Sequence, residues 1–169
     1  METSVKLYSY NYTESRTYLL VLLFVVGNVA LPQLFHLIPM GGKTWLPIYF
    51  FTLIGAYKYG WKVGLLTALT SPLINSLLFG MPTMAVVPAI AVKSGLLAVG
   101  CGWAAKRYRK ATVALLLGVV LFYQLAGTLF EWAWCGSLYA ALQDFRIAIP
   151  GMLLQIFGGY LFINYLIRK

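Results

Sequence analysis

The chain has 169 residues, of which 61% are hydrophobic and only 10% are charged. Soluble domains contain roughly 45–50% apolar and about 25% charged residues, so this composition excludes a soluble globular protein. The net charge of +9 could indicate nucleic-acid binding, but membrane proteins carry such an excess in loops that face anionic lipids and the cytoplasm. The composition therefore predicts an integral membrane protein that contacts the lipid bilayer and does not bind nucleic acid.

Apolar runs separated by Gly, Pro and charged residues predict an all-α bundle of six transmembrane helices, which form a single domain over residues 1–169. The second run has fourteen residues, fewer than the ~20 that one crossing requires, so it could begin in the preceding loop or be partly re-entrant. The polar N-terminal stretch lacks the features of a signal peptide. The predicted spans are Tyr18–Ile38, Leu46–Tyr59, Val63–Phe79, Met84–Ala105, Ala111–Ala133 and Ile147–Ile167.

Lys and Arg residues are distributed unevenly between the two ends of these helices. With both termini in the cytoplasm, the inner side holds ten cationic residues and the outer side holds two, Lys43 and Arg146. The positive-inside rule therefore predicts cytoplasmic termini. The inner residues are Lys6, Arg16, Lys58, Lys62, Lys106, Arg107, Arg109, Lys110, Arg168 and Lys169. The tryptophans fall near predicted helix ends, as interfacial aromatic residues do, at positions Trp45, Trp61, Trp103, Trp132 and Trp134.

The sequence carries no recognisable catalytic or metal-binding motif. It has a single histidine, two separated cysteines, and no phosphate-binding loop or His-Glu-x-x-His sequence. We therefore expect a protein that is not an enzyme and that uses no metal or cofactor. Active transport by such a chain would draw its energy from an ion gradient or from a partner ATPase.

Several polar side chains lie at similar depth below the predicted outer surface and could converge on one outward-facing pocket. His36 and Glu131 could instead be hydrated at the interface, and Asn75 could satisfy backbone groups freed by Pro72. The candidate binding residues are His36, Asn75, Lys93 and Glu131, the deeper Gln124 and Gln155, and the aromatic walls Tyr123, Trp132 and Trp134.

Lys93 is the candidate with the strongest physical constraint. A charge inside an apolar span costs at least about 2.5–3.5 kcal/mol, so Lys93 should face the bundle interior and meet a partner. That partner could be the ligand or the carboxylate of Glu131, and the side chain could also extend toward the interface. If Lys93 contacts the ligand, the substrate should carry a carboxylate, a phosphate or a comparable acceptor.

Small residues recur at four-residue spacing around the turn between the second and third spans. Such spacing lets two helix backbones approach closely. The string, Ala56, Gly60, Gly64 and Ala68, could therefore pack inside the bundle or form a docking face for another membrane subunit.

Several strings in an ordered set resemble the substrate-binding S components of energy-coupling factor (ECF) vitamin transporters. The resemblance extends from about Pro32 to Arg107, and the length and number of spans fit this family over the whole chain. The strings are Leu46-Pro47-Ile48, Gly55, Gly60-Trp61-Lys62-Val63-Gly64-Leu65-Leu66-Thr67, Ser71-Pro72-Leu73-Ile74 and Leu78-Phe79-Gly80-Met81-Pro82.

This resemblance implies a multi-pass protein of a bacterial or archaeal plasma membrane that captures a vitamin or a related micronutrient from outside. It also implies docking on a membrane coupling subunit that is driven by two cytosolic ATPases. The small docking residues that the family carries on the first helix are matched loosely, by Gly27 and Ala30. Lys93 occupies the helix where related sequences often carry an acidic residue, so their substrate does not transfer to this chain.

Two other functions are compatible with the sequence. One is a structural or assembly membrane protein without a ligand, whose polar residues only hold helices together. The other is a stand-alone ion- or proton-coupled carrier that uses Lys93 and Glu131.

Overall fold

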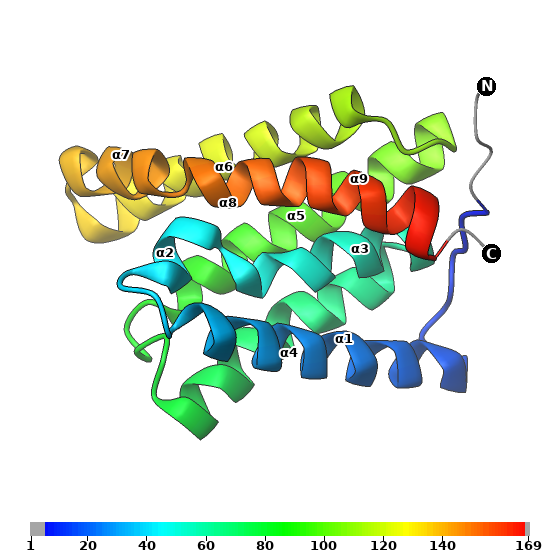
Figure 1. Ribbon diagram of the computed structural model, residues 1–169, viewed down its shortest axis with the longest axis horizontal. Helices are drawn as coiled ribbons and strands as arrows, with labels where there is room; N and C mark the ends of the chain where they lie inside the picture. The colour runs from blue at the N-terminus through cyan, green and yellow to red at the C-terminus, as the bar shows by residue number, and fades with distance from the viewer. Residues whose placement is uncertain (1–5, 168–169) are drawn as a thin grey trace.

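The computed structural model describes residues 6–167, and the regular structure in this range is entirely helical (Figure 1). Two short helices and a 3-10 turn connect the longer ones, and the C-terminal rod combines α-helical with π-helical turns. The elements are α1 (Ser15–Phe35), α2 (Gly41–Trp45), η1 (Pro47–Tyr49), α3 (Phe50–Tyr59), α4 (Trp61–Phe79), α5 (Val87–Tyr108), α6 (Val113–Cys135), α7 (Leu138–Ile147), α8 (Ile149–Leu153), η2 (Leu154–Gly158), α9 (Gly159–Leu161) and η3 (Phe162–Leu166).

Five stretches in the described residues are long and apolar enough to cross a membrane: α1, α4, α5, α6 and the continuous rod Ile149–Leu166. The predicted second span is helical, as η1 and α3, but α3 has only 10 residues and is too short to cross. The sequence predicted no helix between the fifth and the sixth spans, but this segment contains α7. Ser137 caps this helix by accepting a hydrogen bond from the N–H of Ala140.

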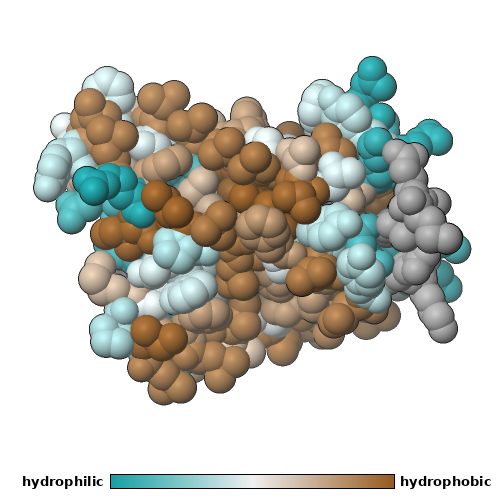
Figure 2. All heavy atoms as spheres, turned by 45° about the horizontal axis from the view of Figure 1, so that its top comes forward, coloured by the Kyte–Doolittle hydropathy of each residue, from teal (hydrophilic) through white to brown (hydrophobic). Residues whose placement is uncertain are grey.

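On the face of the bundle shown in Figure 2, hydrophobic residues fill the middle and hydrophilic residues gather toward the two ends. Trp61 and Trp103 lie toward one end, and Trp132 and Trp134 lie toward the other, with 41–62% of each residue exposed. An apolar band between two aromatic belts is the surface expected for a helical bundle surrounded by lipid. Together with the five long apolar helices, this surface indicates a membrane protein.

The two described chain ends lie at the same end of the bundle, beside the α5–α6 connection (Figure 1). We call this the basic end because it carries the described members of the predicted inner set, from Lys6 to Lys110. Arg168 and Lys169 fall outside the described residues. Lys43 and Arg146 lie at the opposite end with α2 and α7, so the predicted separation of charge is present in the fold.

The short helix α3 lies at the centre of the fold. It packs against α1, α4 and α5, and it also contacts α9 and η3 of the C-terminal rod. Every residue from Thr52 to Lys58 is buried. A helix that is buried on all sides needs small side chains where its neighbours approach most closely.

The small-residue string supplies this close approach between α3 and α4. Ala56 and Ala68 are fully buried, and a Cβ atom on Gly64 would lie only 2.3 Å from the Cβ atom of Ala56. Gly60 has a φ of 106° and forms the turn between the two helices. Of the two roles that the sequence left open for this string, the contacts of these residues support packing inside the bundle.

The two candidate docking residues on α1 differ in exposure. A Cβ atom on Gly27 would lie 2.7 Å from the ring of Phe51, so Gly27 also packs inward. Ala30 is exposed on the outer surface of α1.

The close contact at Gly64 predicts that Gly64→Ala destabilises the protein. The added methyl would collide with the backbone of Ala56, and overpacking of this kind costs about 1–3 kcal/mol. Gly118→Ala is the matched control, because no atom lies within 4 Å of its Cβ position. Gly118→Ala should gain up to about 1 kcal/mol from helix propensity. Thermal unfolding in detergent compares the two variants, and equal effects would contradict the packing role.

The separation of charge predicts the orientation in the membrane, with the basic end in the cytoplasm. Single cysteines introduced at Lys43 or Tyr139 should react with an impermeant maleimide in intact cells. A cysteine at Tyr108 should react only after permeabilisation. Cys135 is exposed and is first replaced by Ser, whereas Cys101 is buried and can remain. Labelling at position 108 in intact cells would show that the basic end lies outside and that the predicted orientation is wrong.

Candidate functional site

A cavity of about 580 Å³ opens at the end of the bundle opposite the basic end. Its walls come from the last turn of α1, the α1–α2 connection, α2, η1, α4, the α4–α5 connection and the start of α5. Its volume is within the range of about 300–1,000 Å³ that is typical of small-molecule sites. The lining residues are Pro32, His36, Ile38, Pro39, Met40, Gly41, Gly42, Lys43, Pro47, Ile48, Asn75, Met81, Pro82, Thr83, Val86 and Ile90.

Asn75 is the fully buried polar residue of this lining. Its Nδ2 donates to the carbonyl oxygens of Asn28, at 2.9 Å, and Ser71, at 3.1 Å. Its Oδ1 accepts a long hydrogen bond, 3.5 Å, from Nε2 of Gln33. The amide nitrogen of Asn75 is therefore fully used, while its carbonyl oxygen keeps acceptor capacity for a ligand.

Asn28 on α1 holds the residues below the cavity in place. Its Nδ2 donates to Oγ1 of Thr52, at 3.0 Å, and to Oγ of Ser71, at 3.2 Å. Its Oδ1 accepts the backbone N–H of Phe51 at 3.1 Å. One fully buried amide thus joins α1, α3 and α4 beside Asn75. Sequence reasoning missed Asn28, although an amide side chain in the middle of a predicted apolar span is a signal for such a role.

The rim of the cavity is formed by the end of α1 and by α2. Met40 and Leu46, which bracket α2, have φ values of 56° and 49°, which are strained for bulky side chains. Gly41 is required because a Cβ atom there would lie only 2.0 Å from the carbonyl oxygen of Phe35. This strained segment brings the ring of His36 and the side chain of Lys43 to the cavity.

The polar groups of the lining favour a ligand that is rich in acceptors or negatively charged. Lys43 and His36 supply donors, and the lining contains no carboxylate. Lys43 lies 3.7 Å from Asp144 on α7, but both side chains are largely exposed, so this pair leaves the ammonium accessible to a ligand. The other lining residues are predominantly apolar and would contact the body of the ligand.

Of the residues predicted to converge on one pocket, His36 and Asn75 line this cavity. The other seven are not among its lining residues, and all of them lie on α5, α6 or η2. Trp132 is exposed on the surface of α6. The predicted pocket is therefore divided. The residues outside the cavity are Lys93, Glu131, Gln124, Tyr123, Gln155, Trp132 and Trp134.

Lys93 forms a buried ion pair with Glu131. Its Nζ lies 2.5 Å from Oε2 of Glu131, and the two side chains are only 10% and 16% exposed. The stem of Lys93 crosses α6 at Gly127, where a Cβ atom would lie 2.4 Å from the Cγ atom of Lys93. The absence of a side chain at Gly127 thus makes room for the lysine one turn before its partner. This is the structural alternative that the sequence left open.

Further polar groups lie deeper between α6 and η2. The hydroxyl of Tyr123 donates to Oε1 of Gln155 at 2.8 Å, and the ring of Tyr123 packs against Tyr49 at 5.5 Å. Oε1 of Gln124 and Nε2 of Gln155 are buried without a partner among the described residues. These amides are enclosed in the bundle and do not belong to the cavity lining.

Comparison of the chain with protein-family models, with curated proteins and with solved structures finds no match.

The geometry predicts that Lys93→Met lowers stability and spares ligand binding. Removing one partner leaves a buried charge uncompensated, which costs about 3–5 kcal/mol. Glu131→Gln should be destabilising for the same reason, and the double variant should recover most of the loss. Thermal unfolding of the wild type, the two single variants and the double variant gives the free energies for a double-mutant cycle. A folded, stable Lys93→Met protein that has lost ligand affinity would instead assign Lys93 to the ligand.

Proposed function

We propose that this chain is the substrate-capture subunit of an ECF-type importer and binds a small water-soluble vitamin or a related micronutrient. The cavity carries this proposal, because it combines the volume of a small-molecule site with a few polar groups in an apolar lining. It opens at the end that the positive-inside rule assigns to the outside. A capture subunit needs its site on that side.

The lining supports a ligand with a flat or apolar body and an acceptor-rich or anionic group. The body would lie against Pro47, Ile48 and Ile90, while Lys43 and His36 would meet the acceptor group at the rim. Asn75 would provide one fixed hydrogen-bond acceptor at the buried side of the cavity. Because Lys93 is paired with Glu131, the selection of an anion would depend on Lys43 and His36.

The energy for transport would come from partner proteins. The sequence contains no nucleotide-binding motif, so the coupling subunit and two cytosolic ATPases implied by the resemblance would supply it. The outer surface of α1 is the surface most suited to this docking. It exposes Leu19, Leu22, Leu23 and Val26 by 57–67%, and Ala30 lies on the same helix.

The proposal predicts that filling the cavity abolishes ligand capture without unfolding the protein. Ile90 lines the cavity and is partly exposed, so Ile90→Trp should occupy the ligand volume and lower affinity by about tenfold or more. Leu77→Trp is the matched control, because Leu77 is 71% exposed and does not line the cavity. The measurement is mass spectrometry of small molecules that co-purify with each detergent-solubilised protein, followed by binding assays with the compound identified.

Two results would contradict this function. One is that wild-type protein carries no small molecule and binds none from a panel of vitamins. The other is full-rate uptake of the captured compound by the chain alone in liposomes, which would favour a stand-alone carrier. Equal loss of binding in Ile90→Trp and Leu77→Trp would show that the ligand does not occupy this cavity.

A further inference from the structure

Lys58, near the C-terminal end of α3, is a buried cation without a counter-charge. The residue is fully buried, and its Nζ has no hydrogen-bond partner in the described part of the chain. A buried ammonium is stable only when it is paired and hydrogen-bonded, as Lys93 is with Glu131. In its charged form, Lys58 would therefore need a partner that residues 6–167 do not supply.

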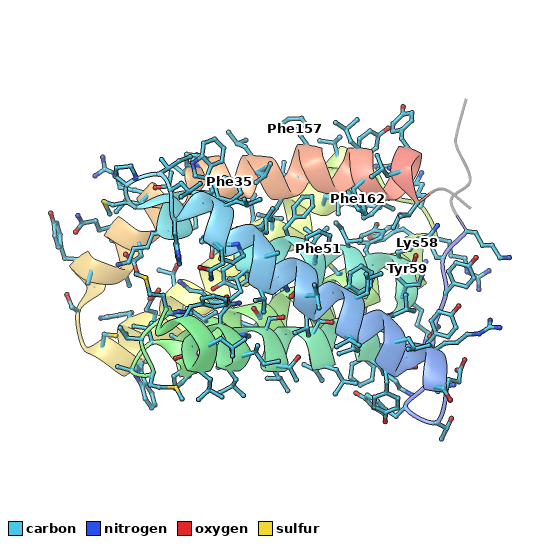
Figure 3. The ribbon with its side chains drawn as sticks, turned by 60° about the horizontal axis from the view of Figure 1, so that its bottom comes forward. Phe35, Phe51, Lys58, Tyr59, Phe157 and Phe162 are labelled. Carbon is cyan, nitrogen blue, oxygen red and sulfur yellow. The ribbon has the colours of Figure 1, made fainter. Side chains whose placement is uncertain are left out.

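The chain covers Lys58 with a short N-terminal segment, residues 7–11, which we call the strap. The N–H of Tyr8 donates to the carbonyl oxygen of Lys58 at 2.8 Å, and the N–H of Tyr10 donates to that of Tyr59 at 3.2 Å. These bonds satisfy carbonyl groups that the end of a helix leaves free. Figure 3 shows Lys58 and Tyr59 at the end of the bundle where the N-terminal segment enters.

The ring of Tyr8 lies close to two ammonium groups. The Nζ of Lys58 is 5.7 Å from the ring centroid, and the Nζ of Lys6 is 5.3 Å from it. The face of a tyrosine ring attracts a cation, but the neutral side chain supplies no counter-charge of the kind that a carboxylate or a phosphate provides. The ammonium groups of Lys6 and Lys58 therefore create a region of positive potential beside the Tyr8 ring, and no negative charge in the ring balances it.

The acidic side chains of the described chain are engaged elsewhere. Glu131 pairs with Lys93, and Asp144 lies near Lys43 at the opposite end. Glu14 accepts the N–H of Asn11 at 2.8 Å. The counter-ion of a charged Lys58 is therefore not among residues 6–167, and Glu2, the remaining acidic residue of the sequence, lies outside them.

The position of Lys58 indicates which anion can reach it. Trp61 begins α4 directly after the turn that follows α3, and Trp103 lies in the last two turns of α5, so this end of the bundle lies at headgroup depth. Anionic lipid phosphates concentrate at this depth near cytoplasmic Lys and Arg residues. Lys6 is exposed and can make the first contact, and the half-buried ring of Tyr8 lies near both ammonium groups.

We propose that Lys58 and Lys6 form a binding site for a phosphate oxyanion, which reaches Lys58 when the Tyr8 ring moves aside. An anionic phospholipid headgroup and free inorganic phosphate offer the same chemistry. An acidic segment of a partner protein is less favoured, because the site lies at the level of the lipid headgroups.

The test is the thermal stability of the full-length protein in neutral maltoside micelles during titration with phosphatidylglycerol. The lipid should raise the unfolding temperature of the wild-type protein, because a ligand stabilises the state that it binds. Lys58→Met should weaken the apparent lipid affinity by about tenfold or more, since a charge-assisted hydrogen bond is lost. Without lipid, Lys58→Met should be more stable than the wild type, because it removes an unpaired buried charge.

Lys106→Met is the matched control, because it removes an exposed lysine at the same end. Its lipid affinity should change by about fivefold or less, which is the contribution of one surface lysine to general attraction by anionic lipid. If Lys58→Met does not fold, Lys58→Gln takes its place, and native mass spectrometry counts the lipids bound to the wild type and to each variant.

A parallel titration with inorganic phosphate distinguishes the two sources of the oxyanion. If only inorganic phosphate stabilises the wild type, the ligand of the site is a free anion. If only phosphatidylglycerol stabilises it, the ligand is the lipid headgroup. An equal response of the wild type, Lys58→Met and Lys106→Met to both titrants would overturn the proposal. Stabilisation only by an acidic protein partner would overturn it as well.

Discussion

The structure depends on a central helix that is shorter than the helices around it. The neighbouring α1, α4 and α5 have 19–22 residues, whereas α3 has 10. At about 1.5 Å per residue, α3 spans roughly half of the ~30 Å hydrocarbon layer. Its close contact with α4 holds it at one depth, and space remains at each of its ends. Other parts of the chain must fill that space or leave it open.

The two ends of α3 are completed in different ways, and each produces a distinct chemical environment. At the N-terminal end, η1 and α2 only partly fill the space, and the cavity remains between them and α4 and α5. At the C-terminal end, the strap covers the last turn and encloses Lys58. The cavity and the buried ammonium are thus consequences of one constraint, although they lie at opposite ends and need not share a ligand.

Polar side chains in the interior hold these positions. Asn28 and Asn75 bond to backbone and hydroxyl groups on three helices, which aligns α1, α3 and α4 beneath the cavity. In lipid, such amides have few alternative partners, so they favour one arrangement of helices over others. Lys93 and Glu131 have a comparable role between α5 and α6, where Gly127 leaves the space that the lysine stem occupies.

Local composition determined which segments of this chain are helical and apolar, because hydropathy and helix-breaking residues act over neighbouring positions. Five of the six predicted spans coincide with stretches long enough to cross a membrane, and the second corresponds to η1 and α3, which is too short to cross. The positions of Lys and Arg along the chain also predicted which end of the bundle carries most of the positive charge. Local composition could not determine which side chains meet, because contacts depend on the rotation and depth of each helix, which packing between distant segments sets. Only the tertiary structure therefore placed His36 and Asn75 in one cavity, paired Lys93 with Glu131, turned Gly64 inward and buried Lys58 beneath the strap.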